Sequence, residues 1–150
     1  MKRAIFPGSF DPFTIGHYDI VLRGLTLFDE IIIGVGVNPS KKSLFPVEKR
    51  LSIIEQAFAN EPRVKAMQYN SLTIDFAQAE EASYILRGIR TVGDFEYERT
   101  TADNNQKLSG IETVVLFTDT KYASISSTIV RDLITYEKDI SRFLPPNVSL

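Results

Sequence analysis

The chain has 150 residues, of which 43% are hydrophobic and 24% charged, with a formal net charge of -2 and no cysteine. This composition is that of a folded globular domain without disulfides, which excludes disordered, fibrous and disulfide-scaffold classes. The slightly acidic balance argues against binding to nucleic acid or to an anionic membrane through bulk charge. No apolar stretch is long enough to span a membrane, and the first one stops at Pro7, too early for a secretory signal, so we expect a cytoplasmic protein.

Short apolar runs alternate along the chain with segments of helical spacing. The runs predict strands at Arg3–Phe6, Glu30–Val37, Val64–Tyr69, Tyr84–Leu86 and Thr113–Thr118. The other segments predict helices at about Gly16–Leu27, Val47–Asn60, Ile74–Glu81, Asp94–Leu108 and Ser126–Tyr136. The tail from Ile140 contains two prolines and is predicted to pack across the surface without regular helix. This order predicts a single α/β domain over residues 1–150, a Rossmann-like, doubly wound, five-stranded parallel sheet with helices on both faces.

The segment Pro7–His17, between the first strand and the first helix, has the composition of an anion-binding turn. Gly8 and Gly16 would let the backbone approach a bound phosphate, and the first amides of the helix carry the positive end of its dipole. His17, the only histidine in the chain, would stand at the start of that helix. Neither a Walker-type phosphate loop nor the dinucleotide-binding glycine fingerprint occurs. Taken alone, a histidine at this position is more often a capping or surface residue than a catalytic one.

Cationic and hydroxyl side chains follow four of the five predicted strands. Ligands of open α/β sheets bind beyond the carboxyl ends of the strands, near the point where the strand order reverses. Every side chain of this set is a cation or a hydrogen-bond donor, which suits several phosphates: Ser9, His17, Lys41, Lys42, Arg87, Arg90, Ser124, Ser126, Ser127 and Thr128. Each cluster alone could be solvated surface or a helix cap. Their joint position at one edge of the sheet favours a nucleotide site.

Four motifs along the chain resemble those of a known superfamily. Gly8-Ser9-Phe10-Asp11-Pro12, followed by Thr14-Ile15-Gly16-His17, resembles the T/H-x-G-H motif of the nucleotidyltransferases. Residues 125–131, reading Ile-Ser-Ser-Thr-Ile-Val-Arg, resemble the I-S-S-T-x-x-R signature of the same superfamily. Arg87-Gly88-Ile89-Arg90, with residues 94–98, is similar to a block of the bacterial phosphopantetheine adenylyltransferases. The resemblance runs from Met1 to about Val148.

The resemblance implies transfer of the adenylyl group from ATP to 4′-phosphopantetheine, giving dephospho-coenzyme A and pyrophosphate. It also implies Mg²⁺ bound mainly through the ATP phosphates, a homohexamer, and inhibition by coenzyme A. By position, the residues expected to meet ATP are Ser9, Phe10, His17, Gly88, Ile89, Arg90, Glu98, Tyr122, Ala123, Ser124, Ile125, Ser126, Ser127 and Thr128. Those expected to meet the phosphopantetheine are Ser9, Lys41, Thr73 and Arg87. Ser9 stands where many members have threonine, and Thr73 where leucine or methionine is common.

Direct adenylyl transfer needs no covalent intermediate, because the acceptor phosphate is already a nucleophile. We therefore assign His17, Lys41 and Arg90 as catalytic residues. His17 would donate a hydrogen bond to the α-phosphate, and Lys41 would bridge the α-phosphate and the acceptor phosphate. Arg90, with residues 126–128, would hold the β- and γ-phosphates, while Arg87 would hold the acceptor. Asp11 is predicted to form the turn rather than to bind the metal.

Two alternatives remain open at this stage. The first is a nucleotidyltransferase with another phosphorylated acceptor, such as nicotinate mononucleotide or a sugar or polyol phosphate. The second is a non-catalytic, nucleotide-binding regulator on the same fold, which would bind the nucleotide without turning it over.

Overall fold

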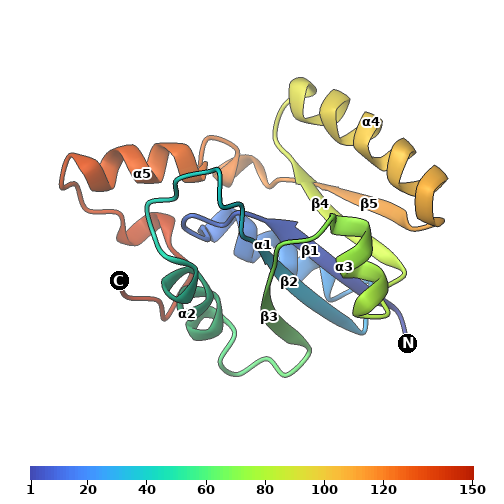
Figure 1. Cartoon of the computed structure of the whole chain (residues 1–150). Helices are drawn as coiled ribbons and strands as arrows, with labels where there is room; N and C mark the ends of the chain where they lie inside the picture. The colour runs from blue at the N-terminus through green and yellow to red at the C-terminus, as the bar shows by residue number, and fades with distance from the viewer.

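The computed structural model describes residues 1–150 and contains one parallel sheet in the order β3-β2-β1-β4-β5 (Figure 1). Its strands are β1 (Arg3–Gly8), β2 (Glu30–Gly36), β3 (Val64–Tyr69), β4 (Tyr84–Ile89) and β5 (Glu112–Phe117). All four neighbouring pairs run parallel. The predicted five-stranded parallel sheet is therefore confirmed.

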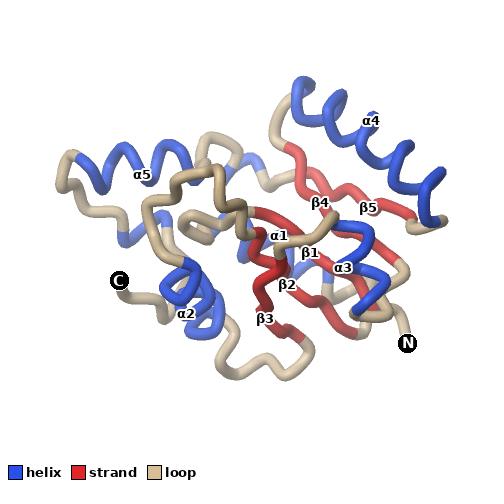
Figure 2. Tube along the Cα trace, viewed as in Figure 1, coloured by secondary structure: helices blue, strands red, loops and turns tan.

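Five α-helices and two short 3-10 turns connect and follow the strands (Figure 2). They are α1 (Ile15–Gly24), α2 (Val47–Ala57), α3 (Thr73–Ala79), α4 (Val92–Ser109), α5 (Ser127–Thr135), η1 (Thr120–Tyr122) and η2 (Ser141–Phe143). None of these helices has the length and apolar content needed to cross a membrane.

Alternation along the strands sends side chains to two separate cores, one on each face of the sheet. Phe6 and Ile33 pack with residues of α1 and α2 on one face. Ile5 and Ile32 pack with residues of α3 on the other face. Because strand side chains alternate between faces, each inner strand needs apolar residues in succession, which is the pattern that predicted a doubly wound sheet.

Two strands end later than the sequence predicted. In β1, Pro7 and Gly8 stay paired with Gly34 and Val35 of β2, so the strand runs past Phe6. In β4, residues 87–89 stay paired with residues 115–117 of β5, so the strand runs past Leu86. Both strand ends are set by backbone pairing with a neighbouring strand, and local composition does not reveal how far that pairing extends. As a result Arg87 stands on the strand itself.

The end of the chain packs through a small third core. Val130 of α5 is fully buried against Ile140 and Leu144 of the tail. The backbone N–H of Ser149 donates to the side-chain oxygen of Gln56 on α2, which brings the C-terminus beside that helix (Figure 1). The tail therefore lies against the molecule without a regular α-helix, as its prolines predicted.

The strand order reverses between β1 and β4. From β1 the chain builds β2 and β3 on one side and then returns to build β4 and β5 on the other. Loops that leave the carboxyl ends of β1 and β4 therefore diverge, and a crevice opens between them.

Candidate active site

A pocket of about 350 Å³ opens at this reversal point. We call it the His17 pocket. It is lined by many of the residues predicted to meet the nucleotide or the acceptor: Ser9, Phe10, His17, Lys41, Arg87, Gly88, Arg90, Ile125, Ser126, Ser127 and Thr128. The structure thus brings together groups that follow four different strands, from opposite ends of the chain.

His17 is held in one orientation by the start of α1. The backbone N–H of Thr14 donates to Nδ1 of His17 at 3.0 Å, and the Thr14 hydroxyl accepts from the His17 backbone N–H at 3.4 Å. The rings of Phe10 and Phe13 pack beside the imidazole, with centroids 5.0 and 5.3 Å away. Since Nδ1 accepts a hydrogen bond, the proton of the neutral ring must reside on Nε2. His17 is therefore oriented as an Nε2–H donor.

The surroundings of His17 also keep it neutral. Burial, together with the positive charges of Arg87 and Arg90, lowers the pKa of His17 from 6.5 to about 3. Each effect penalises the charged imidazolium. At neutral pH the ring therefore offers one hydrogen-bond donor and carries no charge.

Because His17 is the only histidine, its titration can be followed without assignment ambiguity. In the free protein we expect ¹⁵N NMR to show the Nε2–H tautomer with no protonation between pH 8 and about 5, since its pKa is lowered to about 3. Between pH 6.5 and about 3 the unfolded chain binds a proton here and the folded chain does not. This residue therefore makes the free energy of unfolding fall as the pH falls through that window. A titration midpoint near 6.5 would contradict the burial and orientation described here.

Asp11 anchors the loop that carries Lys41. Its two carboxylate oxygens accept from the backbone N–H groups of Leu44 and Phe45, at 2.8 and 2.9 Å, and its side chain is buried. The Lys41 ammonium lies 3.4 Å from the Ser9 hydroxyl. With both oxygens engaged by backbone, Asp11 acts as a loop anchor, and the Lys41 loop is tied to the turn that carries Ser9.

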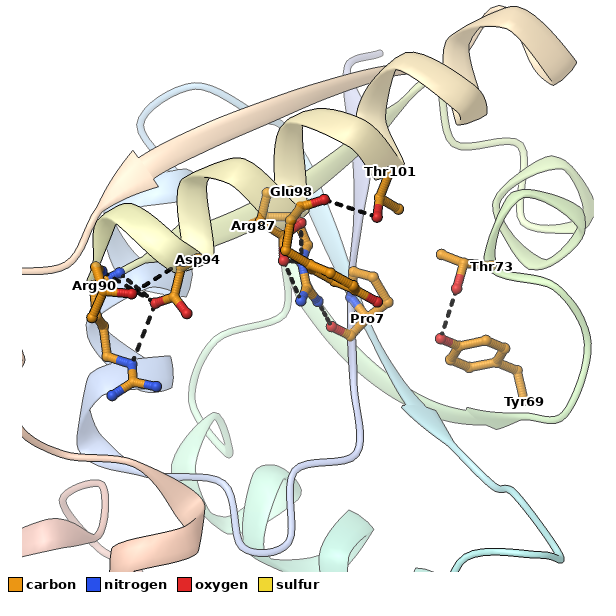
Figure 3. A network of polar contacts seen from close by, with 10 residues as sticks. Pro7, Tyr69, Thr73, Arg87, Arg90, Asp94, Glu98 and Thr101 are labelled. Atoms are coloured by element: carbon orange, nitrogen blue, oxygen red, sulfur yellow. Dashed lines mark hydrogen bonds and ion pairs between the residues drawn. The ribbon is translucent and has the colours of Figure 1, made fainter.

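Arg87 is oriented by Glu98 of α4 (Figure 3). The Arg87 guanidinium donates to the Glu98 carboxylate at 2.8 and 3.0 Å, and it also donates to the carbonyl oxygen of Pro7. Glu98 is the one buried residue of α4. Such a two-pronged pair fixes the plane of the guanidinium. Glu98 thus lies beside Arg87 and does not line the His17 pocket, although it was predicted to meet ATP.

Arg90 is placed by the start of α4. Asp94 accepts from the backbone N–H groups of Arg90 and Thr91 at 2.9 and 3.2 Å, and Thr91 caps the helix by accepting from the Asp94 N–H. The Arg90 guanidinium stays 4.0 Å from the Asp94 carboxylate and lines the His17 pocket (Figure 3).

Residues 126–128, also predicted to meet the nucleotide, form the start of α5. Ser126 caps the helix by accepting from the Ile129 N–H at 3.2 Å, and the Ser127 hydroxyl donates to the Pro12 carbonyl at 2.8 Å. The Thr128 hydroxyl accepts from Arg131, a pocket residue that sequence reasoning did not include in the site. The arginine of the I-S-S-T-x-x-R signature was the available signal for it. Ile89, Tyr122, Ala123 and Ser124 lie outside the pocket lining.

A second pocket, of about 290 Å³, adjoins the first. We call it the Tyr69 pocket. The two pockets share Pro7, Gly8 and Arg87, so the Arg87 guanidinium stands at their junction. Thr73, predicted to meet the acceptor, lies here, with its hydroxyl 3.1 Å from that of Tyr69 (Figure 3). Sequence reasoning missed the wall formed by Leu72, Tyr97, Asn105, Leu108 and Thr113. Tyr97 lies in the block of residues 94–98 but was given no role, and no local motif marks the other four.

The fold and these two pockets define a nucleotidyltransferase, and comparison with known proteins agrees. Residues 5–133 match the family model described as cytidylyltransferase-like, so the chain belongs to that family. The phosphopantetheine adenylyltransferases of Phocaeicola vulgatus and Bacteroides thetaiotaomicron are 60% and 59% identical to it over 150 residues, which cover 100% of this chain and 99% of each relative. Within the superfamily, the chain belongs to the phosphopantetheine adenylyltransferases. The predicted resemblance is thereby confirmed.

Solved structures share the fold at much lower identity. A putative nicotinate-nucleotide adenylyltransferase from Vibrio parahaemolyticus superposes with a TM-score of 0.68 at 20% identity, over 97% of this chain and 95% of that one. A bifunctional NMN adenylyltransferase/ADP ribose pyrophosphatase from Francisella tularensis gives 0.76 at 15% identity, over 98% of this chain and 46% of the other. These likenesses establish the architecture and do not bear on the acceptor.

Proposed function

We propose that the protein transfers the adenylyl group of ATP to 4′-phosphopantetheine, releasing dephospho-coenzyme A and pyrophosphate. The observation that carries the proposal is the junction of two pockets at one arginine. Arg87 separates a pocket rich in phosphate-binding groups from a pocket with a largely apolar wall. An acceptor with a terminal phosphate and a long uncharged arm fits that arrangement, with its phosphate at Arg87.

The Tyr69 pocket suits an uncharged amide-bearing arm. Its apolar wall includes Leu72, Ile74 and Leu108. Polar side chains in the same lining, those of Thr73 and Asn105, can form hydrogen bonds with amides of the arm. These features favour phosphopantetheine over nicotinate mononucleotide, whose ring is flat and charged.

In the proposed reaction, an oxygen of the acceptor phosphate forms a bond to the α-phosphorus of ATP. The bond between that phosphorus and the oxygen that bridges it to the β-phosphorus breaks. Pyrophosphate leaves with the electron pair, and no protein group is covalently modified. The Nε2–H of His17 would donate to an α-phosphate oxygen, and Lys41 would neutralise both reacting phosphates. Arg90, with the start of α5, would hold the leaving phosphates. Fixing two mutually repelling anions in line can lower the barrier by about 7 to 11 kcal/mol.

We also propose Mg²⁺ as the metal, held mainly through phosphate oxygens of ATP and water. Asp11 is the one carboxylate that lines the His17 pocket, and both of its oxygens already accept backbone N–H groups. The pocket therefore offers no free carboxylate to a metal ion, which fits an ion that binds together with the nucleotide. When bound, the ion would neutralise charge on the leaving pyrophosphate.

The hexamer and the inhibition by coenzyme A implied by the family remain part of this proposal. Helix α4 exposes Val92, Phe95 and Tyr97 in spite of their apolar character, which supports a subunit contact there. Light scattering after size-exclusion chromatography measures the assembly. Addition of coenzyme A to the transfer assay measures the inhibition.

The test of the function is pyrophosphate release from ATP with a panel of phosphorylated acceptors. We expect release with 4′-phosphopantetheine and background release with nicotinate mononucleotide or sugar phosphates. Preference for one of these other acceptors would assign the chemistry to the alternative enzyme. Nucleotide binding without turnover of any acceptor would support the non-catalytic regulator.

Glu98 provides a test of which substrate each pocket holds. We expect Glu98→Gln to raise the KM for 4′-phosphopantetheine about 3- to 10-fold, because a neutral amide orients Arg87 less firmly, and to leave the KM for ATP unchanged. Steady-state kinetics with each substrate varied in turn measures both values. Asp103→Asn, which alters an exposed carboxylate on the same helix, is the matched control. A raised KM for ATP alone would support the sequence prediction that Glu98 meets ATP.

A further inference from the structure

A third cavity, of about 430 Å³, lies behind the Lys41 loop at the start of α2. We call it the α2 cavity. It shares Ser9, Asp11, Lys41 and Arg131 with the His17 pocket, so the two are neighbours on either side of Lys41. The proposed transfer reaction assigns no substrate to this cavity.

The α2 cavity contains a buried arginine without an acidic partner. Arg50 is 4% exposed and forms no ion pair. Its Nε donates to the carbonyl oxygen of Phe45 at 3.1 Å, and its Nη1 donates to those of Ser9 and Gly36 at 2.8 and 3.3 Å. Its Nη2 has no acceptor in the protein and is not sealed from solvent. This nitrogen therefore opens to the cavity that the residue lines. A buried guanidinium with two free N–H donors is a ready partner for an oxyanion.

The start of α2 adds a second group of free donors. Its N-cap residue is Pro46, which provides no side-chain cap, and the first helical hydrogen bonds begin at the N–H groups of Lys49 and Arg50. The N–H groups of Val47 and Glu48 therefore have no acceptor in the protein, and both residues line the α2 cavity. An uncapped helix start of this kind attracts an anion through its free amides and its dipole.

The balance of charge around the cavity also favours an anion. Four cations line it, namely Lys41, Lys42, Arg50 and Arg131, against the two carboxylates of Asp11 and Glu48. The Asp11 carboxylate is already occupied by the N–H groups of Leu44 and Phe45. Glu48 is exposed at the rim and is the one free opposing charge.

We propose that the α2 cavity is a second anion-binding site, distinct from the His17 pocket, and that its ligand is pyrophosphate. The choice of pyrophosphate among phosphate-class anions rests on the proposed function, because the adjoining His17 pocket would release that product. Lys41 and Arg131 line both cavities, so the departing anion could contact the same two cations in each of them. The site would hold pyrophosphate after it leaves the α-phosphorus.

The test is calorimetric titration of inorganic pyrophosphate into the protein saturated with Mg²⁺ and α,β-methylene-ATP, which occupies the His17 pocket and cannot be cleaved. We expect one pyrophosphate to bind per chain under these conditions. Lys42→Ala should weaken this binding about 3- to 10-fold and Glu48→Gln should tighten it about 2- to 3-fold, because each changes one charge at the rim. Lys107→Ala, which removes an exposed lysine from α4, is the matched control and should bind as the wild type does.

Three results would overturn the proposal. Absence of pyrophosphate binding beside the analogue would show that Arg50 only ties the loops together. Equal affinity of Lys42→Ala and Lys107→Ala would place the bound anion elsewhere. Inorganic phosphate binding as tightly as pyrophosphate would remove pyrophosphate as the specific ligand. The titration measures binding without turnover, so its outcome is independent of the transfer assay. Failure of the second site and failure of the proposed function can therefore be told apart.

Discussion

Replacing His17 by alanine should lower kcat about 10²- to 10³-fold while the KM for ATP changes less than about 3-fold. The physical reason is that His17 offers a single oriented Nε2–H, and charge on the α-phosphate oxygens is greatest in the transition state. The neutral ring contributes little to ground-state attraction of ATP, because its pKa is lowered to about 3 and it carries no charge. Steady-state kinetics of pyrophosphate release measures both constants.

The control for this variant is His17→Gln, whose side-chain amide can place a donor near the position of Nε2. We expect it to recover part of the lost turnover, whereas a merely structural role would give both variants similar activity. Thermal unfolding of the two proteins separates loss of folding from loss of catalysis. Full activity of His17→Ala would remove His17 from the mechanism.

Replacing Lys41 by alanine should have the second largest effect. We expect kcat to fall about 10- to 10²-fold and the KM for 4′-phosphopantetheine to rise about 10-fold, because Lys41 would neutralise both reacting phosphates. Its ammonium lies 3.4 Å from Ser9, in a loop that Asp11 anchors, so the charge is already placed at the pocket before substrates bind. Kinetics with each substrate varied separately measures the two constants.

Lys41→Arg keeps the charge and should retain more of the turnover than Lys41→Ala. Lys107→Ala removes the same charge at a distance and should behave as the wild type. A change confined to the KM for ATP would mean that Lys41 serves the nucleotide and not the acceptor. The proposed bridging role would then be wrong.

Arg87 and Glu98 form a pair that no local pattern in the sequence encodes. Both residues stand in a block that resembles the family, and the sequence assigned them to different substrates. The structure joins them in one ion pair at the junction of two pockets. The pairing depends on how α4 lies over β4, and the ten intervening residues give no local sign of that geometry.

The sequence by itself determined the order of strands and helices, the parallel sheet, the edge at which the candidate site forms, and the family. It could do so because apolar periodicity, turn residues and short motifs are local properties of the chain. It also predicted that His17, Lys41 and Arg90 meet at that edge, and the structure places all three in the lining of the His17 pocket.

The tertiary structure alone decided the tautomer of His17, the partners of Arg87 and Arg50, and the residues that wall the second and third cavities. These features arise where segments distant in the sequence meet: Arg50 binds the carbonyl of Ser9, and Arg131 binds that of Asp11. Hydrogen bonds between such segments, and the burial that shifts the pKa of His17, depend on packing that no local pattern encodes.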